Sequence, residues 1–264
     1  RFTNDGCWEV LVPGKTAFIY APFDMLALLH GVLGLHDSTQ PPPEFPDFET
    51  LYARFLDRLR EHLDGFHAGA DNFWSTSLPA PLLSMFVDDC IERGRGYHYR
   101  GAHYNVLAPH AGGMANVANS LLVIKKLVYE QKYLTLSEFV DILRRDYEGE
   151  EALRRLILSR FVFYGNDDDE ADEIMERLFN DYTALAARVP ERNGVLRPPG
   201  ISTFGREIGW RLDGRGASPD GHHRGEILAT NFSPSPGTDF SGPTAVIKSY
   251  CKMDLTRVPN GATI

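Results

Sequence analysis

Residues 104–128 read YNVLAPHAGGMANVANSLLVIKKLV, and this stretch joins a strand pattern to a helix pattern through two glycines. The short apolar run from Tyr104 to Ala108 predicts a strand, and Gly112-Gly113 predicts the turn before a helix. Apolar residues then recur at helical spacing on one face, at Val117, Leu121, Ile124 and Val128. A strand followed by a long helix with one apolar face is typical of α/β proteins.

Further long helices are predicted on both sides of this stretch, because apolar residues recur there at the same spacing. They are expected over residues 25–33, 48–63, 82–91, 153–157 and 174–185. Thr135 and Glu138 have the spacing of a capping box, which predicts one more helix through Ile142. The proline-rich residues 36–47 and the polar, glycine-containing residues 65–77 predict loops.

Glycine and proline become frequent after Gly194, and three short β-prone runs follow. These runs are Ile201–Phe204, Glu226–Phe232 and Ala245–Tyr250, and each of them predicts a strand. Long helices that alternate with short buried strands indicate an α/β protein. The sequence contains no internal repeat.

The composition narrows the class of protein. The chain has 264 residues, 43% of them hydrophobic and 24% charged, which is typical of a globular protein with one large or two modest domains. The net charge of −9 argues against a nucleic-acid partner and against attraction to an anionic membrane. No membrane span or signal peptide is predicted. Cys7, Cys90 and Cys251 lie far apart without a CxxC pair, which argues against disulfides and a zinc site and favours a reducing, cytoplasmic setting.

The most reactive short pattern is Asp5-Gly6-Cys7-Trp8-Glu9. In an extended segment, residues two apart face the same side, so Cys7 and Glu9 would share one face at roughly 6–7 Å along the chain. A thiol and a carboxylate on one face suit chemistry in which one group abstracts hydrogen and the other moves a proton. A buried structural cysteine beside a surface glutamate fits the same spacing.

Three other patterns resemble binding motifs but lack part of the required spacing. Val12–Thr16 looks like the end of a phosphate-binding loop, yet Glu9 stands where that motif needs glycine. Asn166–Asp169 looks like a calcium loop, yet Asp172 stands where glycine is needed, so we interpret these acids as the start of a helix. Five histidines form no i, i+4 metal pair and are interpreted as core or solvated residues: His98, His103, His110, His222 and His223. A Cys–His hydrolase would need one of them near Cys7, and that alternative stays open.

Several blocks of the chain, in order, resemble the glycyl radical enzyme family, the group that includes pyruvate formate-lyase. The first is Gly6–Glu9 followed by Pro13–Thr16, which resembles the active-site loop of the family. The later blocks are Pro81–Gly94, Gly113–Leu121 with Ile124–Lys126, Tyr164–Asp169, Ser218–Gly221, and Ser233–Ser235 running to Gly237–Asp239 and Gly242–Val246. Together they span nearly the whole chain.

The resemblance implies an α/β fold, a ten-stranded barrel of which residues 1–264 supply much of the second half with its surrounding helices. Because the chain starts at Arg1 with a reactive motif close behind, we expect an internal piece of a longer protein. The expected missing parts are the N-terminal half of the barrel and a C-terminal domain, beyond Ile264, that carries the radical glycine.

The resemblance also implies roles, a cofactor and partners. Cys7 would become the transient thiyl radical that takes hydrogen from a small-molecule substrate, and Glu9 would be the general acid/base. The fragment binds no cofactor of its own. The radical would be a protein-based glycyl radical installed by a radical S-adenosylmethionine activating enzyme with an iron–sulfur cluster. The family further implies a homodimer.

Three positions at which this chain differs from the family pattern indicate which reaction to expect. Trp8 follows Cys7 where pyruvate formate-lyase has a second cysteine, so the Cys-x-Glu form resembles the dehydratase, decarboxylase and carbon–heteroatom lyase branches. Ala21 stands about where diol dehydratases carry an aspartate, with Asp24 nearby, and His222 stands where an arginine is expected. We therefore predict a radical lyase that eliminates water, carbon dioxide, an amine or sulfite, and that is inactive as this fragment. Pyruvate formate-lyase-like acyl transfer and an inactive scaffold protein stay open as alternatives.

Overall fold

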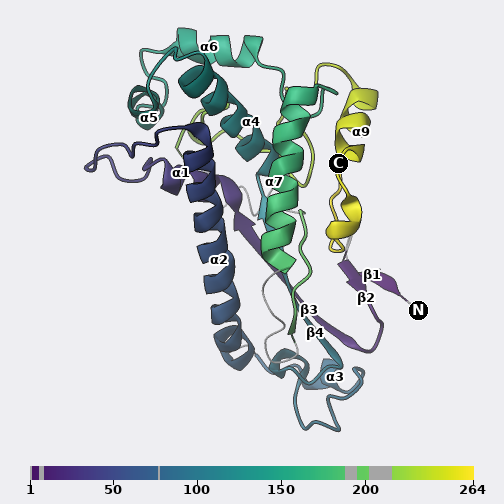
Figure 1. Ribbon diagram of the computed structural model, residues 1–264. Helices are drawn as coiled ribbons and strands as arrows, with labels where there is room; N and C mark the ends of the chain where they lie inside the picture. The colour runs from purple at the N-terminus through teal and green to yellow at the C-terminus, as the bar shows by residue number, and fades with distance from the viewer. Residues whose placement is uncertain (1, 6–8, 77, 188–194, 202–215) are drawn as a thin grey trace.

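The computed structural model describes residues 2–5, 9–76, 78–187, 195–201 and 216–264 (Figure 1). Strand β1 (Thr3–Asp5) and strand β2 (Glu9–Leu11) pair antiparallel. Strands β3 (Thr16–Asp24), β4 (Tyr104–Gly112) and β5 (Val195–Leu196) form a second sheet in the order β3-β4-β5, and both of its pairings are parallel. A bridge between His110 and Gly200 extends the parallel contact beyond β5.

Long helices cover one face of the parallel sheet (Figure 1). The first two are α1 (Met25–Val32) and α2 (Phe48–Thr76). The next helix, α4 (Met114–Ile124), continues directly as the π-helical segment η2 (Lys125–Glu130). The remaining elements are α3 (Pro81–Ser84), η1 (Tyr97–Tyr99), α5 (Leu136–Arg144), α6 (Glu151–Arg160), α7 (Asp169–Ala187), α9 (Pro243–Cys251) and η3 (Leu255–Arg257).

Helix α4 forms the centre of the core, because every one of its residues is buried. It contacts α7 and α1, and its small residues Ala115 and Ala118 let these neighbours approach closely. The helix begins at Gly113, whose φ of 70° is a conformation that residues with a Cβ rarely adopt. A Cβ at Gly113 would also lie 3.3 Å from Leu228 Cδ1. The glycine pair therefore allows the chain to turn from β4 into α4 without strain.

Most of the predicted helices are confirmed. The helices expected from residues 25, 48 and 174 correspond to α1, α2 and α7. The capping box at the start of α5 is present: Glu138 N donates to Thr135 Oγ1 at 3.2 Å, and Thr135 N donates to Glu138 Oε2 at 2.8 Å. The strand expected at Tyr104–Ala108 is β4, which continues to Gly112.

Two predictions in the first half of the chain are wrong. A loop was expected over residues 65–77, but α2 continues through Gly65 without a break and ends at Thr76. The expected helix over residues 82–91 is helical only at Pro81–Ser84. Beyond it the backbone turns, with Asp89 at φ 71°, and Asp88 N donates to Gly14 O at 2.6 Å. A contact with the β2–β3 turn thus replaces a helical hydrogen bond.

The strand predictions after Gly194 are also wrong where the structure describes them. Ala245–Tyr250 lies in α9, which Pro243 opens at a first-turn position that favours helix. Residues 226–232 are irregular, because their backbone bonds elsewhere: Ala229 N donates to Asn116 Oδ1 at 2.8 Å, and Phe232 N donates to Thr263 O at 2.9 Å. Ile201 is outside any strand, and the rest of its predicted run lies outside the described residues.

Candidate active site

The β1–β2 hairpin carries the predicted catalytic pair. Asp5 pairs with Glu9 in the antiparallel register, so residues 6–8 are the connection between the two strands. Cys7 and Trp8 lie outside the described residues, and for Glu9 the structure describes the backbone in β2. The backbone at Glu9 is extended, which is one condition for the expected shared face. The shared face of Cys7 and Glu9 stays a prediction.

A tight turn connects this hairpin to the parallel sheet. Lys15 N donates to Val12 O at 3.0 Å, and Thr16 Oγ1 accepts from Val12 N at 3.1 Å. Gly14 has a φ of 71°, which suits glycine. Lys15 lies 3.7 Å from Asp88 in an exposed ion pair. Residues 12–15 thus form the turn that connects β2 to β3.

The carboxyl half of β3 offers few acidic groups. Ala21 is buried and contributes no polar atom. Asp24 is the N-cap of α1, and its Oδ1 accepts from Ala27 N at 3.0 Å. This carboxylate therefore stabilises the start of a helix.

Tyr20 and His110 form an aromatic pair that the sequence did not indicate. Tyr20 pairs with Ala108 and Pro22 pairs with His110, so the two rings are diagonal neighbours on adjacent strands, with centroids 4.6 Å apart. His110 is fully buried, and a Cβ at Gly200 would come within 2.6 Å of its Cε1. Glycine at position 200 therefore lets the backbone pack directly on the imidazole. Residues about 90 positions apart become neighbours only through the parallel register.

The two described thiols differ from what a radical-bearing cysteine needs. Cys90 is buried in an apolar cluster with Ala17 and Leu107, and burial raises the pKa of its thiol. Cys251 is exposed at the end of α9. A hydrogen-abstracting sulfur must reach a substrate while being shielded from solvent. Neither Cys90 nor Cys251 combines these properties, and Cys7 stays the predicted radical-bearing residue.

The acids and histidines that resemble metal sites have structural contacts. Asp168 Oδ1 accepts from Ala171 N at 3.1 Å at the start of α7, and Asp167 lies 2.8 Å from Lys248. The predicted helix-start role of these acids is confirmed. His103 Nδ1 lies 2.9 Å from Asp89 on the surface. Within the part of the chain that the structure describes, no three histidine, cysteine, aspartate or glutamate side chains gather as a metal site.

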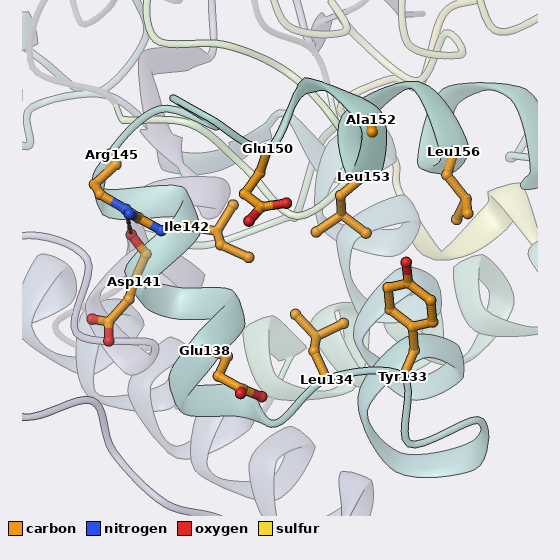
Figure 2. A pocket seen from close by; sticks show the side chains of 10 residues that line it. All are labelled: Tyr133, Leu134, Glu138, Asp141, Ile142, Arg145, Glu150, Ala152, Leu153 and Leu156. Carbon is orange, nitrogen blue, oxygen red and sulfur yellow. Dashed lines mark hydrogen bonds between the residues drawn. The ribbon is translucent and has the colours of Figure 1, made fainter.

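One cavity, of about 540 Å³, lies in the helical layer between α5 and α6 (Figure 2). Two of its polar groups are already engaged: Glu138 belongs to the capping box, and Arg145 Nε donates to Asp141 O at 3.3 Å. In Figure 1, α5 and α6 lie far from the β1–β2 hairpin. This cavity is therefore not part of the candidate active site.

The comparisons with known proteins agree with this architecture. Residues 2–209 match the family model described as pyruvate formate lyase-like. The chain is 34% identical over 235 residues to trans-4-hydroxy-L-proline dehydratase of Clostridioides difficile, covering 86% of this chain and 29% of the relative. It is 31% identical to (2S)-3-sulfopropanediol dehydratase of Klebsiella oxytoca, covering 97% of this chain and 33% of the relative.

The solved structures show the same relationship. The chain superposes on hydroxyproline dehydratase from Clostridioides difficile with a TM-score of 0.87 at 30% identity, covering 98% of this chain and 34% of that one. For a glycyl radical enzyme from Archaeoglobus fulgidus the TM-score is 0.82 at 28% identity, covering 100% and 35%. These neighbours confirm the predicted fold class, an α/β chain that forms part of a glycyl radical enzyme barrel.

The parallel sheet with one helix-covered face, together with the solved structures that it matches, makes this chain a piece of a glycyl radical enzyme barrel. The chain belongs to the pyruvate formate lyase-like family of glycyl radical enzymes. It spans about a third of the length of the relatives it matches. Among the described residues, no helix is both long enough and apolar enough to cross a membrane.

Proposed function

We propose that the protein containing this chain is a glycyl radical lyase in which Cys7 abstracts hydrogen and Glu9 transfers a proton. The carrying observation is the family match over residues 2–209, which includes the β1–β2 hairpin. Relatives that cover most of the chain are named as dehydratases, and another, 35% identical, is an isethionate sulfite-lyase. Elimination from a small polar substrate is the chemistry these names share.

The proposed reaction balances as follows. The Cys7 sulfur, as a thiyl radical, takes a hydrogen atom from a substrate carbon, so an S–H bond forms and a carbon-centred radical remains. Glu9 removes a proton from the neighbouring heteroatom, or gives one to the leaving group, while the adjacent bond to that group breaks. The product radical then takes the hydrogen atom back from Cys7, and the thiyl radical is restored.

The interior of the expected barrel would suit these roles. A carboxyl group enclosed in a barrel is desolvated, and desolvation raises a carboxyl pKa toward neutral pH, which suits a group that both donates and accepts a proton. Among the three thiols, Cys90 is packed in the core and Cys251 is exposed, as described above. A glycyl radical, on a glycine in a part of the protein outside this chain, would take the hydrogen atom of the Cys7 thiol, so that a C–H bond forms at the glycine, the S–H bond breaks and the thiyl radical remains on Cys7.

The partners follow from the same proposal. A separate radical S-adenosylmethionine activating enzyme installs the glycyl radical, and the full protein forms a homodimer. Residues 1–264 act as a partial barrel domain, and the 264-residue chain alone does not turn over substrate. The leaving group is water, carbon dioxide, an amine or sulfite. Because Asp24 caps α1 and Ala21 is apolar, we propose a substrate other than a simple diol.

The experiment activates the full-length protein anaerobically with an activating enzyme, S-adenosylmethionine and reductant, and then offers a panel of substrates. The panel contains trans-4-hydroxy-L-proline, (2S)-3-sulfopropanediol, isethionate and 1,2-propanediol, with product measured by mass spectrometry. We expect elimination from at least one non-diol substrate, abolished in Glu9→Gln and retained in Cys251→Ala. The proposal would be contradicted if the full-length protein formed no radical with an activating enzyme that is shown to activate a relative. That result would favour the alternative of an inactive scaffold protein.

A further inference from the structure

Exposed apolar side chains gather in one short segment, residues 78–91, which we call the apolar platform. Six of its large apolar side chains are between 43% and 84% exposed: Leu78, Leu82, Leu83, Met85, Phe86 and Ile91. In the rest of the described chain, exposed side chains of this kind occur singly along the sequence. Isolated exposed apolar residues are normal, whereas an exposed apolar cluster marks a surface that another structure covers.

Hydrogen bonds attach the apolar platform to the parallel sheet. Ser84 Oγ donates to Ala80 O at 2.6 Å and accepts from Tyr97 N at 2.9 Å. The Tyr97 hydroxyl in turn accepts from Phe18 N, in β3, at 3.0 Å. On an ordinary protein surface the polar groups face water, but here the Ser84 hydroxyl bonds to the chain and the large apolar side chains stay outside.

The inner side of the apolar platform is apolar as well. Val87 and Cys90 are buried in one cluster with Ala17 of β3 and Leu107 of β4. A helix that is apolar on all sides is buried on all sides, and the same reasoning applies to this short helix and the turns after it. The platform therefore has the composition of an inner layer, with the sheet on one side and a covering surface expected on the other.

Relatives of the chain have the additional polypeptide that such a covering surface needs. The chain spans about a third of the length of the relatives it matches, so the same fold there is part of a much longer polypeptide. A covering surface on the same polypeptide is present at a high effective concentration, whereas a second copy loses translational and rotational freedom when it binds. These costs favour the same polypeptide over a second copy as the occupant.

The β1–β2 hairpin indicates which part of the polypeptide arrives beside the apolar platform. Asp88 N donates to Gly14 O at 2.6 Å, so the platform contacts the β2–β3 turn. Thr3 pairs with Leu11 directly before that turn, so β1 starts at the same place. Phe2, which precedes β1, is itself 79% exposed. Polypeptide that precedes residue 1 therefore arrives next to the apolar platform.

Polypeptide that follows residue 264 leaves from the other end of the sheet. Tyr104, the first residue of β4, pairs with Thr16 directly after the β2–β3 turn. Gly261 O accepts from Ile201 N at 2.9 Å, one residue beyond the position that bridges His110 near the end of β4. The six residues from the start of β4 to this bridge span roughly 20 Å, and Figure 1 shows the C-terminus beside α9, away from α3. The preceding part is thus the nearer one.

We propose that the polypeptide preceding residue 1 packs an apolar surface of its own on the apolar platform. The contact holds the platform from outside, while the sheet and the β2–β3 turn hold it from inside. It therefore also supports the turn that follows the β1–β2 hairpin. The proposal goes beyond the proposed function, because it applies to an active lyase and to an inactive scaffold alike, and its test does not depend on turnover.

The test uses the full-length protein with the photoreactive amino acid p-benzoylphenylalanine in place of Phe86. After irradiation and digestion, mass spectrometry identifies the peptide that is joined to position 86. We expect a peptide from the polypeptide that precedes residue 1, in a protein that runs as a monomer on a denaturing gel. The same substitution at Phe240, an exposed aromatic residue of another segment, is the control and should not join that peptide.

Three results of this experiment would overturn the proposal. A cross-linked species of twice the monomer mass would assign the apolar platform to a second copy. A peptide from the polypeptide that follows residue 264 would assign it to the other flanking part. Absence of any cross-link at position 86 would show that the platform stays exposed in the full-length protein.

A second variant makes the test independent of cross-linking yield. Leu82→Cys in the full-length protein places a thiol on the apolar platform, and alkylation by iodoacetamide, measured at position 82 by mass spectrometry, reports its accessibility. We expect alkylation at least about tenfold slower in the native protein than in urea, at every protein concentration, because the interface must open before the thiol reacts. Equal rates in the native and unfolded protein, or protection that grows with protein concentration, would contradict the proposal.

Discussion

Helix α4 and the segment of residues 81–94 have comparable apolar spacing in the sequence and opposite surroundings in the fold. Every residue of α4 is buried between α1 and α7. In the other segment only four residues are helical, and Leu82 and Phe86 are 69% and 73% exposed. Apolar periodicity leads to a long helix in α4, where neighbouring helices of the same chain cover the apolar side chains. It does not in residues 81–94, where those side chains stay exposed, because most helical stability comes from packing.

The largest expected effect is the loss of a core side chain in α4. Leu121→Ala should lower the free energy of unfolding by about 2–5 kcal/mol, because it leaves a cavity in a fully buried site. Leu82→Ala, the matched change in the exposed segment, should change it by less than about 0.5 kcal/mol. Urea unfolding of the 264-residue chain measures both, and equal losses would contradict the comparison.

The next effect tests the polar contacts that hold residues 218–229 on α4. Asn116 donates to Asp220 and accepts from Ala229 N, so Asn116→Ala leaves a buried carboxylate and a buried amide short of partners. The expected loss of unfolding free energy is about 2–3 kcal/mol. Gln131→Ala, at the end of η2, is the control. A loss below about 1 kcal/mol in Asn116→Ala would show that these residues are held by other contacts.

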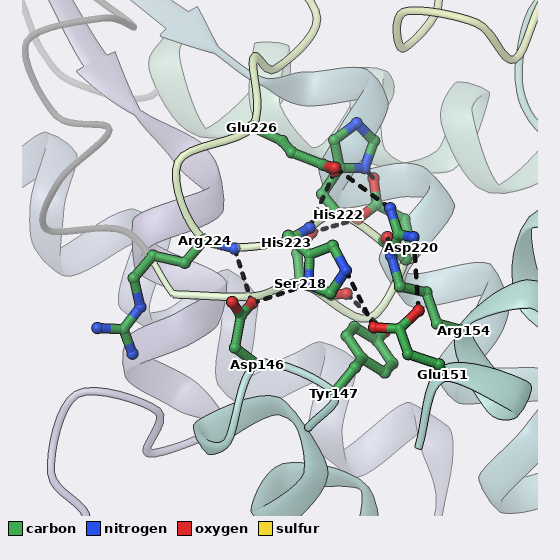
Figure 3. Close-up of polar contacts among 11 residues, drawn as sticks. Asp146, Tyr147, Glu151, Arg154, Ser218, Asp220, His222, His223, Arg224 and Glu226 are labelled. Atoms are coloured by element: carbon green, nitrogen blue, oxygen red, sulfur yellow. Dashed lines mark hydrogen bonds and ion pairs between the residues drawn. The ribbon is translucent and has the colours of Figure 1, made fainter. Parts of the chain in front are cut away.

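The pH dependence of stability tests the pair beneath the same segment. The folded-state pKa of His222 is raised by Asp220 against the effect of burial, with Glu226 and Arg154 also facing the ring (Figure 3). Its contribution is full below about pH 6.5, the unfolded value, and is lost as pH rises through the raised value. The pKa of Asp220 is lowered by His222, again against burial, so its contribution is lost only as strongly acid pH crosses that lowered value.

The thermal unfolding midpoint of the chain should therefore fall as pH rises above about 6.5. His222→Arg keeps its charge over this range, so it should flatten the dependence. A His222→Arg slope equal to the wild type would assign the pH dependence to other groups.

The smallest expected effect concerns the start of α5. Thr135→Ala removes the acceptor for Glu138 N and one half of the capping box. The expected loss is about 1 kcal/mol of unfolding free energy. Ser159→Ala in α6 removes only a long, exposed hydroxyl contact, of 3.4 Å, and should cost less than about 0.5 kcal/mol. Denaturant midpoints of the two variants measure the difference.

The sequence predicted the elements whose signals are local. The turn at Gly112-Gly113, the capping box at Thr135 and the periodicity of α7 all act within a few residues, and each is present. The errors arose where distant contacts decide the backbone. Residues 226–232 have strand-like composition, yet bonds to Asn116 and Thr263 hold them in irregular conformation.

The candidate sites divide in the same way. Cys7 and Glu9 could be proposed from the sequence, because their spacing is a local feature and the family resemblance is carried by sequence blocks. The contact of Tyr20 with His110 depends on the parallel register of β3 and β4. The attachment of the apolar platform to the sheet depends on contacts with Gly14 and Tyr97. Signals of that kind exist only in the folded chain.

The central claim is that Cys7 carries the hydrogen-abstracting radical. The most direct measurement compares product formation from the accepted substrate by the wild-type protein and by Cys7→Ala. Both proteins are first activated to the same glycyl radical content, as measured by electron paramagnetic resonance. The account predicts an unchanged radical doublet and no detectable product in Cys7→Ala, while Cys90→Ala and Cys251→Ala keep turning over. Product from Cys7→Ala at a rate near that of wild type would contradict the account and assign hydrogen abstraction to another residue.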